Sequence, residues 1–203
     1  MLTPMRWIAN LSVLAVLACL TGCGGPEPVP QPGAESKPAA PAIPEEVEAA
    51  AQAILGSEAE VLLHGDLART GAVQVLSINR IKKAPEGAPP GTLFTRLAIV
   101  EKAGDKWREV LRCDEHLKNP NGFLAATPIS PVNGWRLQQE KHSEQGLVLY
   151  FTPLQKPAGG SQMTIGVRWN PKLKRYQSLD RGYQTFLGET PMLEKVGFDF
   201  RGR

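Results

Sequence analysis

The stretch Met163-Thr164-Ile165-Gly166-Val167-Arg168-Trp169 alternates apolar residues with small or polar ones. Successive side chains of a β-strand point to opposite faces, so the four apolar positions share one face. An apolar face backed by a more polar one is typical of a half-buried antiparallel strand. The earlier stretch Leu147-Val148-Leu149-Tyr150-Phe151 is apolar on both faces and therefore predicts a central strand.

The remaining strands follow from the same reading. Segments rich in Val, Ile, Leu and aromatic residues are separated by Gly, Pro, Asn and Asp. The predicted strands are residues 61–63, 72–82, 93–102, 106–113, 135–141, 147–152, 163–169 and 175–179. Short connections at 103–105, 143–146 and 170–174 predict hairpins, whereas 114–134 is expected to be irregular. The pattern predicts a mainly β fold of about eight strands, as an antiparallel meander, a sandwich or a partly open barrel.

One helix is predicted before the strands, at residues 45–56. Pro44 precedes this segment, glutamates fill its first turn, alanines its middle, and Gly56 ends it. Its apolar stripe consists of Val47, Ala50, Ala51, Ile54 and Leu55. The helix and the strands together predict one β-rich globular domain at residues 45–203.

The N-terminus has the features of an export signal. Arg6 precedes an apolar run at 7–20 that is too short to span a bilayer, which takes roughly 20 apolar residues. The run ends in Leu20-Thr21-Gly22-Cys23, which closely resembles the lipobox of bacterial lipoproteins. The resemblance implies that signal peptidase II removes residues 1–22, and that Cys23 is lipidated with a diacylglycerol and a third acyl chain. The alternatives are an ordinary cleaved signal, Cys23 as a plain thiol, or Cys19 as the lipidated cysteine, although Leu17-Ala18 before Cys19 puts a bulky residue where the lipobox has a small one.

Residues 23–44 are predicted to be the lipidated cysteine and a flexible linker. Its seven prolines lie among small and polar residues, a composition that buries too little apolar surface to fold. Several acyl chains hold a protein stably on a membrane. The resemblance therefore implies a bacterial cell-envelope location, with the domain facing the periplasm or the exterior. Gly24 replaces the aspartate that retains such lipoproteins at the inner membrane, so the outer membrane is expected.

Reactive side chains gather in Cys113-Asp114-Glu115-His116. Cys19 leaves with the signal and Cys23 is the anchor, so Cys113 is the single cysteine of the domain and cannot form an intramolecular disulfide. We expect Cys113 to be a buried small hydrophobe. Cys113 and His116 remain candidates for a nucleophilic pair, although residues three apart on a strand point to opposite faces. No metal site is expected, because structural zinc takes four ligands.

The segment Gly65-Asp66-Leu67-Ala68-Arg69-Thr70-Gly71 resembles the calcium loop of FG-GAP repeats, the blades of integrin-type β-propellers. The resemblance implies a blade-like meander, with Asp66 as the matching ligand position. Ala68 offers no ligand where calcium requires several oxygen atoms, so the match argues against calcium. The alternative is a Gly-bounded turn between two strands.

The composition narrows the function without defining it. A formal net charge of +3 gives no electrostatic basis for nucleic-acid binding. The chain has no Gly-x-Ser-x-Gly, no His-Glu-x-x-His and no phosphate-binding glycine loop. We expect a binding or structural module without a cofactor other than the lipid, held on the membrane and contacting an envelope protein or glycan. The alternatives are a cell-wall-directed hydrolase with a site near Cys113, and a lipoprotein inhibitor of a lytic enzyme.

Overall fold

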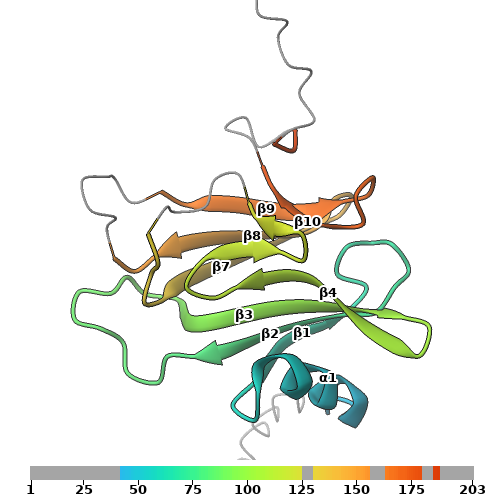
Figure 1. Ribbon diagram of the computed structural model, residues 1–203, viewed down its shortest axis with the longest axis horizontal. Coiled ribbons are helices and arrows are strands. Elements are labelled where there is room, and N and C mark those ends of the chain that lie inside the picture. The colour runs from blue at the N-terminus through green and yellow to red at the C-terminus, as the bar shows by residue number, and fades with distance from the viewer. Residues whose placement is uncertain (1–41, 125–129, 156–162, 180–184, 188–203) are drawn as a thin grey trace, which may run out of the picture. The chain divides into compact units, whose positions relative to one another are not determined.

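The computed structural model describes residues 42–124, 130–155, 163–179 and 185–187, which belong to one compact unit. Figure 1 shows how its helix and strands are arranged. In chain order they are α1 (Glu45–Leu55), β1 (Glu60–Gly65), β2 (Gln74–Arg80), β3 (Thr92–Ala103), β4 (Lys106–Cys113), β5 (Leu117–Asn119), β6 (Gly122–Phe123), β7 (Trp135–His142), β8 (Gly146–Pro153), β9 (Ile165–Asn170) and β10 (Arg175–Ser178). All pairings between these strands are antiparallel.

The sheet divides at β3, which pairs with three other strands. β2 lies along one edge of β3, and β4 and β7 share the opposite edge. β7 pairs with residues 92–94 of β3, whereas β4 pairs with residues 97–103. Residues 95 and 96 therefore lie between the two partners, and the sheet forks there. One limb continues through β7 to β10 and the other through β4 to β6.

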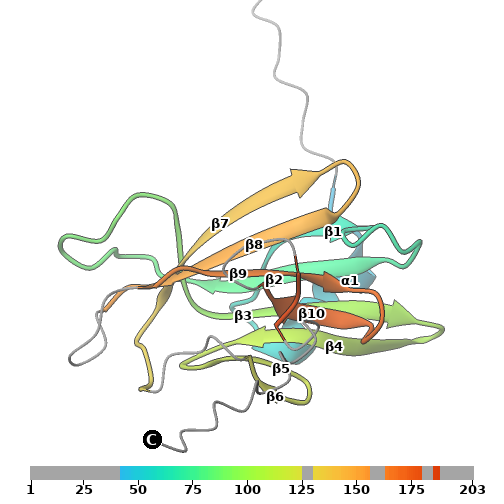
Figure 2. The same cartoon turned by 90° about the horizontal axis from the view of Figure 1, so that it is seen from above.

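The main core lies between the two limbs, which curl toward each other as a half-barrel. In Figure 1, β7–β10 lie above β1–β4, and Figure 2 shows the same strands from above. The Phe151 ring meets the rings of Phe94 and Trp135 edge-on, at centroid distances of 6.1 and 6.3 Å. All three side chains are fully buried. Such aromatic pairs each contribute about 0.5–1.5 kcal/mol beyond the burial of area.

Helix α1 covers the other face of β1–β3. Val47 packs with Val75 of β2 and Val100 of β3 in a cluster separate from the main core. Leu76 and Ile99, the strand neighbours of these valines, point into the main core instead, because side chains alternate along a strand. The helix therefore shields one face of the sheet, while the β7–β10 limb shields the other.

A chain of hydrogen-bonded polar side chains, buried except for Arg108, connects β10 with β2, β3 and β4. The Tyr176 hydroxyl donates to Oε1 of Gln74 at 2.8 Å, and Nε2 of Gln74 donates to Glu101 at 2.8 Å. Arg108 donates to the other carboxylate oxygen of Glu101 at 2.7 Å, and to the carbonyl of Lys174 at 3.3 Å. Tyr176 and Gln74 are fully buried. This network holds the end of one limb against the other.

The structure confirms the predicted fold, a mainly β, antiparallel, partly open barrel with one N-terminal helix. The predicted strands are present, including the central strand at β8 and the three hairpins. Trp135, Trp169 and Tyr176 are buried as expected, and Tyr150 packs at the edge of a smaller cluster.

Two expectations are wrong in detail. Residues 114–134 were expected to be irregular but contain β5 and β6, joined by the turn Asn119-Pro120-Asn121-Gly122. Gly122 has a φ of 127°, and the Asn119 side chain accepts a hydrogen bond from the Asn121 N–H at 3.0 Å, which is how short polar residues stabilise turns. The strand predicted from residue 163 begins at Ile165, and Met163 lies before it and is 56% exposed.

The predicted signal peptide at 1–22, the lipidation site Cys23 and the linker as far as residue 41 lie outside the described residues. Within the described residues, no helix has both the length and the apolar character that a membrane span requires.

Candidate functional site

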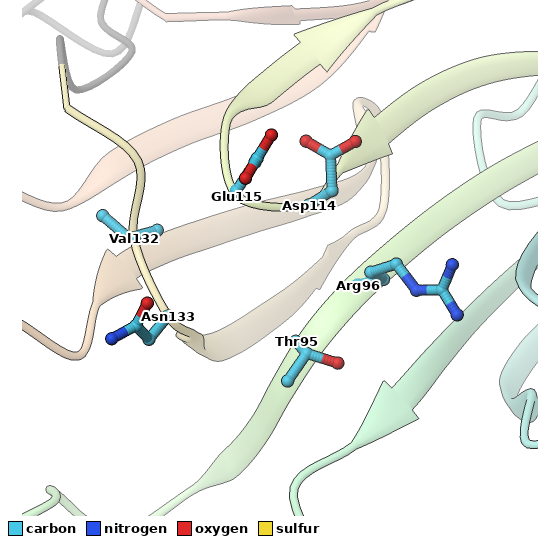
Figure 3. Close-up of a pocket in the computed structure, with 6 residues that line it drawn as sticks. All are labelled: Thr95, Arg96, Asp114, Glu115, Val132 and Asn133. Carbon is cyan, nitrogen blue, oxygen red and sulfur yellow. The ribbon is translucent and has the colours of Figure 1, made fainter.

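A hollow of about 410 Å³ lies at the fork of the sheet, and it contains half of the reactive motif singled out in the sequence. It is lined by Thr95 and Arg96 of β3, Asp114 and Glu115 after β4, and Val132 and Asn133 before β7. Figure 3 shows these six residues around the space between the two limbs. The hollow forms because β4 and β7 pair with different parts of β3. We call it the fork hollow.

Backbone contacts fix the wall that carries the two acidic residues. The Asp114 carbonyl accepts a hydrogen bond from Nε1 of the buried Trp135 at 2.6 Å. The Glu115 carbonyl accepts one from the Val132 N–H at 3.0 Å. The turn after β4 is thus joined to the segment that leads into β7, and the two sides of the hollow are held in a defined position.

The carboxylates of Asp114 and Glu115 differ in their exposure and in the number of their polar partners. Asp114 accepts from the His116 N–H at 3.0 Å and lies 3.4 Å from the Lys118 ammonium, and its side chain is 19% exposed. The Glu115 side chain is 70% exposed, and its carboxylate lies 3.9 Å from Nδ1 of His116. Glu115 is therefore the carboxylate that a molecule entering the hollow would meet.

Arg96 contributes its backbone and stem to the hollow rather than its charge. Its guanidinium donates to the Leu55 carbonyl at 3.0 Å, at the C-terminus of α1, where a cation also interacts favourably with the helix dipole. In Figure 3 the Arg96 side chain points away from Asp114 and Glu115. The hollow therefore offers hydrogen-bonding groups and one exposed negative charge.

Cys113 and His116 have different surroundings in the structure. Cys113 is fully buried in the main core, and this burial raises the pKa of its thiol well above the usual range. His116 packs its ring against Phe123, with centroids 5.0 Å apart. Cys113 behaves as the buried hydrophobe that the sequence predicts, and a protonated thiol in the core is a poor nucleophile.

Asp66 organises the β1–β2 loop. Its two carboxylate oxygens accept hydrogen bonds from the N–H groups of Thr70 at 2.8 Å and Gly71 at 2.9 Å. Arg69, inside this loop, has a positive φ of 56°. The segment that resembles a calcium loop is thus a Gly-bounded turn with its own carboxylate as the central acceptor. No group of three His, Cys, Asp or Glu side chains suited to a metal occurs in the part of the chain that the structure describes.

Sequence reasoning missed Thr95, Arg96, Val132 and Asn133 as lining residues. Nothing local identifies the first two, because they become accessible only where β3 changes partners. Val132 and Asn133 fall in the stretch 114–134, which was expected to be irregular, and nothing in that stretch indicates which strand they lie beside. No protein-family model, curated protein or solved structure matches this chain.

Proposed function

We propose that this chain is a lipid-anchored lipoprotein of the bacterial cell envelope whose β-domain binds a partner through the fork hollow. The anchor rests on the lipobox that ends at Cys23. The binding role rests on one observation: the fixed hollow exposes Glu115, Asn133 and Thr95, while the neighbouring thiol is buried. A partner protein or glycan with hydrogen-bond donors or a positive charge fits this lining.

The same observation argues against the hydrolase alternative. Nucleophilic catalysis by cysteine needs a thiolate within hydrogen-bond reach of its base. The Cys113 thiol has a raised pKa and faces the main core, whereas the His116 ring packs on Phe123. The described side chains near Cys113 therefore do not form the thiolate–imidazole pair that the hydrolase alternative requires.

The inhibitor alternative has one specific observation in its favour. Phe123 is 61% exposed on β6, the edge strand of a short hairpin. An exposed aromatic side chain beside Lys118 and His116 is the type of anchor that fills a pocket on a partner. If this hairpin is the contact surface, Phe123→Ala abolishes partner binding and substitutions in the fork hollow do not.

Site-specific crosslinking tests the binding proposal. A photo-reactive residue is placed at position 133 or 115 of the full-length lipidated chain in intact cells. A matched control places it at position 58, whose native glutamate side chain is 72% exposed and does not line the hollow. We expect a discrete adduct from 133 and 115 and none from 58. The same adducts at all three positions, or no adduct at the hollow, would contradict the proposal.

The anchor is tested separately. Replacing Cys23 by serine should remove fatty-acid labelling and shift the protein from the membrane fraction to the soluble fraction, because the acyl chains supply the membrane affinity. Continued fractionation of the Cys23→Ser variant with membranes after the leader has been cleaved would show that another feature anchors the chain.

A further inference from the structure

A second hollow, of about 340 Å³, lies where three chain connections meet. The β1–β2 loop contributes Ala68, Arg69 and Thr70, and the β7–β8 hairpin contributes Glu144 and Gln145. Arg168 and Trp169 of β9, Pro171 beyond it and Phe186 complete the lining. Figure 1 shows the β1–β2 loop and the β9–β10 hairpin at the same end of the half-barrel. We call this the loop pocket.

Tight packing fixes the loops against each other. The Leu147 N–H donates to the Leu67 carbonyl at 2.8 Å, which joins the β7–β8 hairpin to the β1–β2 loop. A Cβ atom added to Gly146 would come within 2.6 Å of the same carbonyl oxygen, so glycine is required for this approach. Asp66 holds the other side of the loop through the N–H groups of Thr70 and Gly71. The pocket therefore exists before any ligand arrives.

The lining combines guanidinium groups with polar and apolar surfaces. Arg168 donates to Gln145 at 2.6 Å, and its guanidinium lies 4.5 Å from the centre of the Phe186 ring. This stacking and hydrogen bond hold Arg168 in one orientation. Arg69 is exposed and has a left-handed backbone conformation, directly before the two residues whose N–H groups bind Asp66. Non-glycine residues held in such conformations cost free energy and are enriched at binding sites.

The charge and the shape of the pocket narrow the ligand class. Two arginines and Glu144 give the lining one net positive charge, which matches a singly charged anion better than a phosphate dianion. Arginine binds carboxylates with paired hydrogen bonds. Trp169 and Phe186 are only 7% and 5% exposed, so neither offers the open aromatic face on which a sugar ring stacks.

From this geometry we infer that the loop pocket binds the free carboxylate at the end of a peptide chain. Arg69 makes the charged contact, Thr70 and Gln145 supply further hydrogen bonds, and the exposed Pro171 packs against the last side chain. Asp66 is a positioning residue, because its carboxylate acts through the loop that presents Arg69. The inference concerns a surface different from the fork hollow and does not depend on the proposed function.

The test uses the full chain and two short probes, N-acetyl-Ala-Ala and the same dipeptide with a C-terminal amide. Binding is followed by NMR chemical-shift changes or calorimetry. We expect the free carboxylate to bind at least tenfold more tightly than the amide, and Arg69→Gln to remove at least that tenfold preference. Lys172→Gln, which removes a neighbouring exposed charge outside the lining, is the matched control and should leave both affinities unchanged.

Several outcomes would overturn the inference. Equal affinity for the acid and the amide, or an Arg69→Gln variant that binds as the original chain does, would exclude carboxylate recognition by Arg69. Saturation by inorganic phosphate at concentrations as low as the peptide acid requires would reassign the pocket to a different anion. The absence of saturable binding below about 10 mM peptide would also reject it. None of these results bears on the crosslinking at the fork hollow.

Discussion

The hydrogen bond from Tyr176 to Gln74 should contribute measurably to stability, although it is a single contact. Replacing Tyr176 by phenylalanine keeps the ring and its edge-on contact with Trp169, whose centroid is 5.5 Å away. The substitution removes the donor of a 2.8 Å hydrogen bond between two fully buried side chains. Oε1 of Gln74 then has no partner, and an unsatisfied buried acceptor costs about 1–3 kcal/mol.

Urea unfolding monitored by tryptophan fluorescence measures this cost, because Trp135 and Trp169 are buried reporters. We expect Tyr176→Phe to lower the free energy of unfolding by about 1–3 kcal/mol. In a Gln74→Met background the acceptor is already gone, so the same substitution should be neutral or stabilising. The resulting coupling free energy should be about 1–3 kcal/mol, within the range found for contacting residues.

The alkaline pH dependence gives a second readout. Burial, followed by the carboxylates of Glu101 and Asp66, raises the pKa of Tyr176 well above its usual value near 10. Above about pH 10 the unfolded chain loses this proton while the folded protein keeps it, so stability falls as the pH rises. The Phe variant should lack this contribution to the alkaline slope. A Tyr176→Phe variant with unchanged stability, zero coupling to Gln74 and an unchanged alkaline slope would refute the reasoning.

Three further predictions concern single positions, all measured on the purified protein. In urea unfolding, Gly146→Ala should destabilise the protein by about 1–3 kcal/mol more than Gly104→Ala. Both glycines have a positive φ, but only at Gly146 would the added Cβ clash with the backbone of a neighbouring loop. Equal losses of stability would contradict this. The hydrogen bond from Arg80 lowers the pKa of Glu60, so this exposed pair should contribute under about 1 kcal/mol to the free energy of unfolding at neutral pH. The contribution should be lost below about pH 4, where Glu60 is protonated, and should be absent in Glu60→Gln. A Gln variant whose stability depends on acid pH as the original does would show that the pair is irrelevant. Cys113 should resist thiol reagents in the native protein and react at the rate of unfolding, whereas fast labelling at neutral pH would place the thiol at the surface.

The fold class was predictable because the apolar pattern that identifies each strand lies within that strand's own sequence. Alternation along residues 163–169 and the double-sided apolar run at 147–151 identify β9 and β8 directly. The β5–β6 hairpin was missed because strands of three and two residues are too short to show a period. The fork at Thr95 was out of reach for another reason: a strand sequence says which face is apolar, but not which strand pairs along each edge.

For the candidate sites as well, features within one segment were predictable and features that join distant segments were not. The burial of Cys113 was predictable, since a free cysteine is among the residue types most often found in a core. Asp66 was singled out as the one matching position of a segment that resembles a calcium loop, although calcium itself was not expected. The structure shows the alternative, a Gly-bounded turn, in which the Asp66 carboxylate accepts from two backbone N–H groups. The loop pocket itself joins residues from positions 69 to 186, and no pattern within one segment could bring these together.

The two hollows lie at opposite ends of β7, which makes their roles separable. Asn133 lies just before this strand and Glu144 just after it, and the eight residues between the hairpin and the fork span about 27 Å at roughly 3.4 Å per residue. Substitutions so far apart with no shared partner act additively within about 0.5 kcal/mol. Glu115→Gln should therefore weaken crosslinking at the fork hollow without changing peptide binding, and Arg69→Gln should do the reverse. If either variant altered both readouts to the same extent, the two ends would have to be coupled through the half-barrel, and neither hollow could then be treated as an independent site.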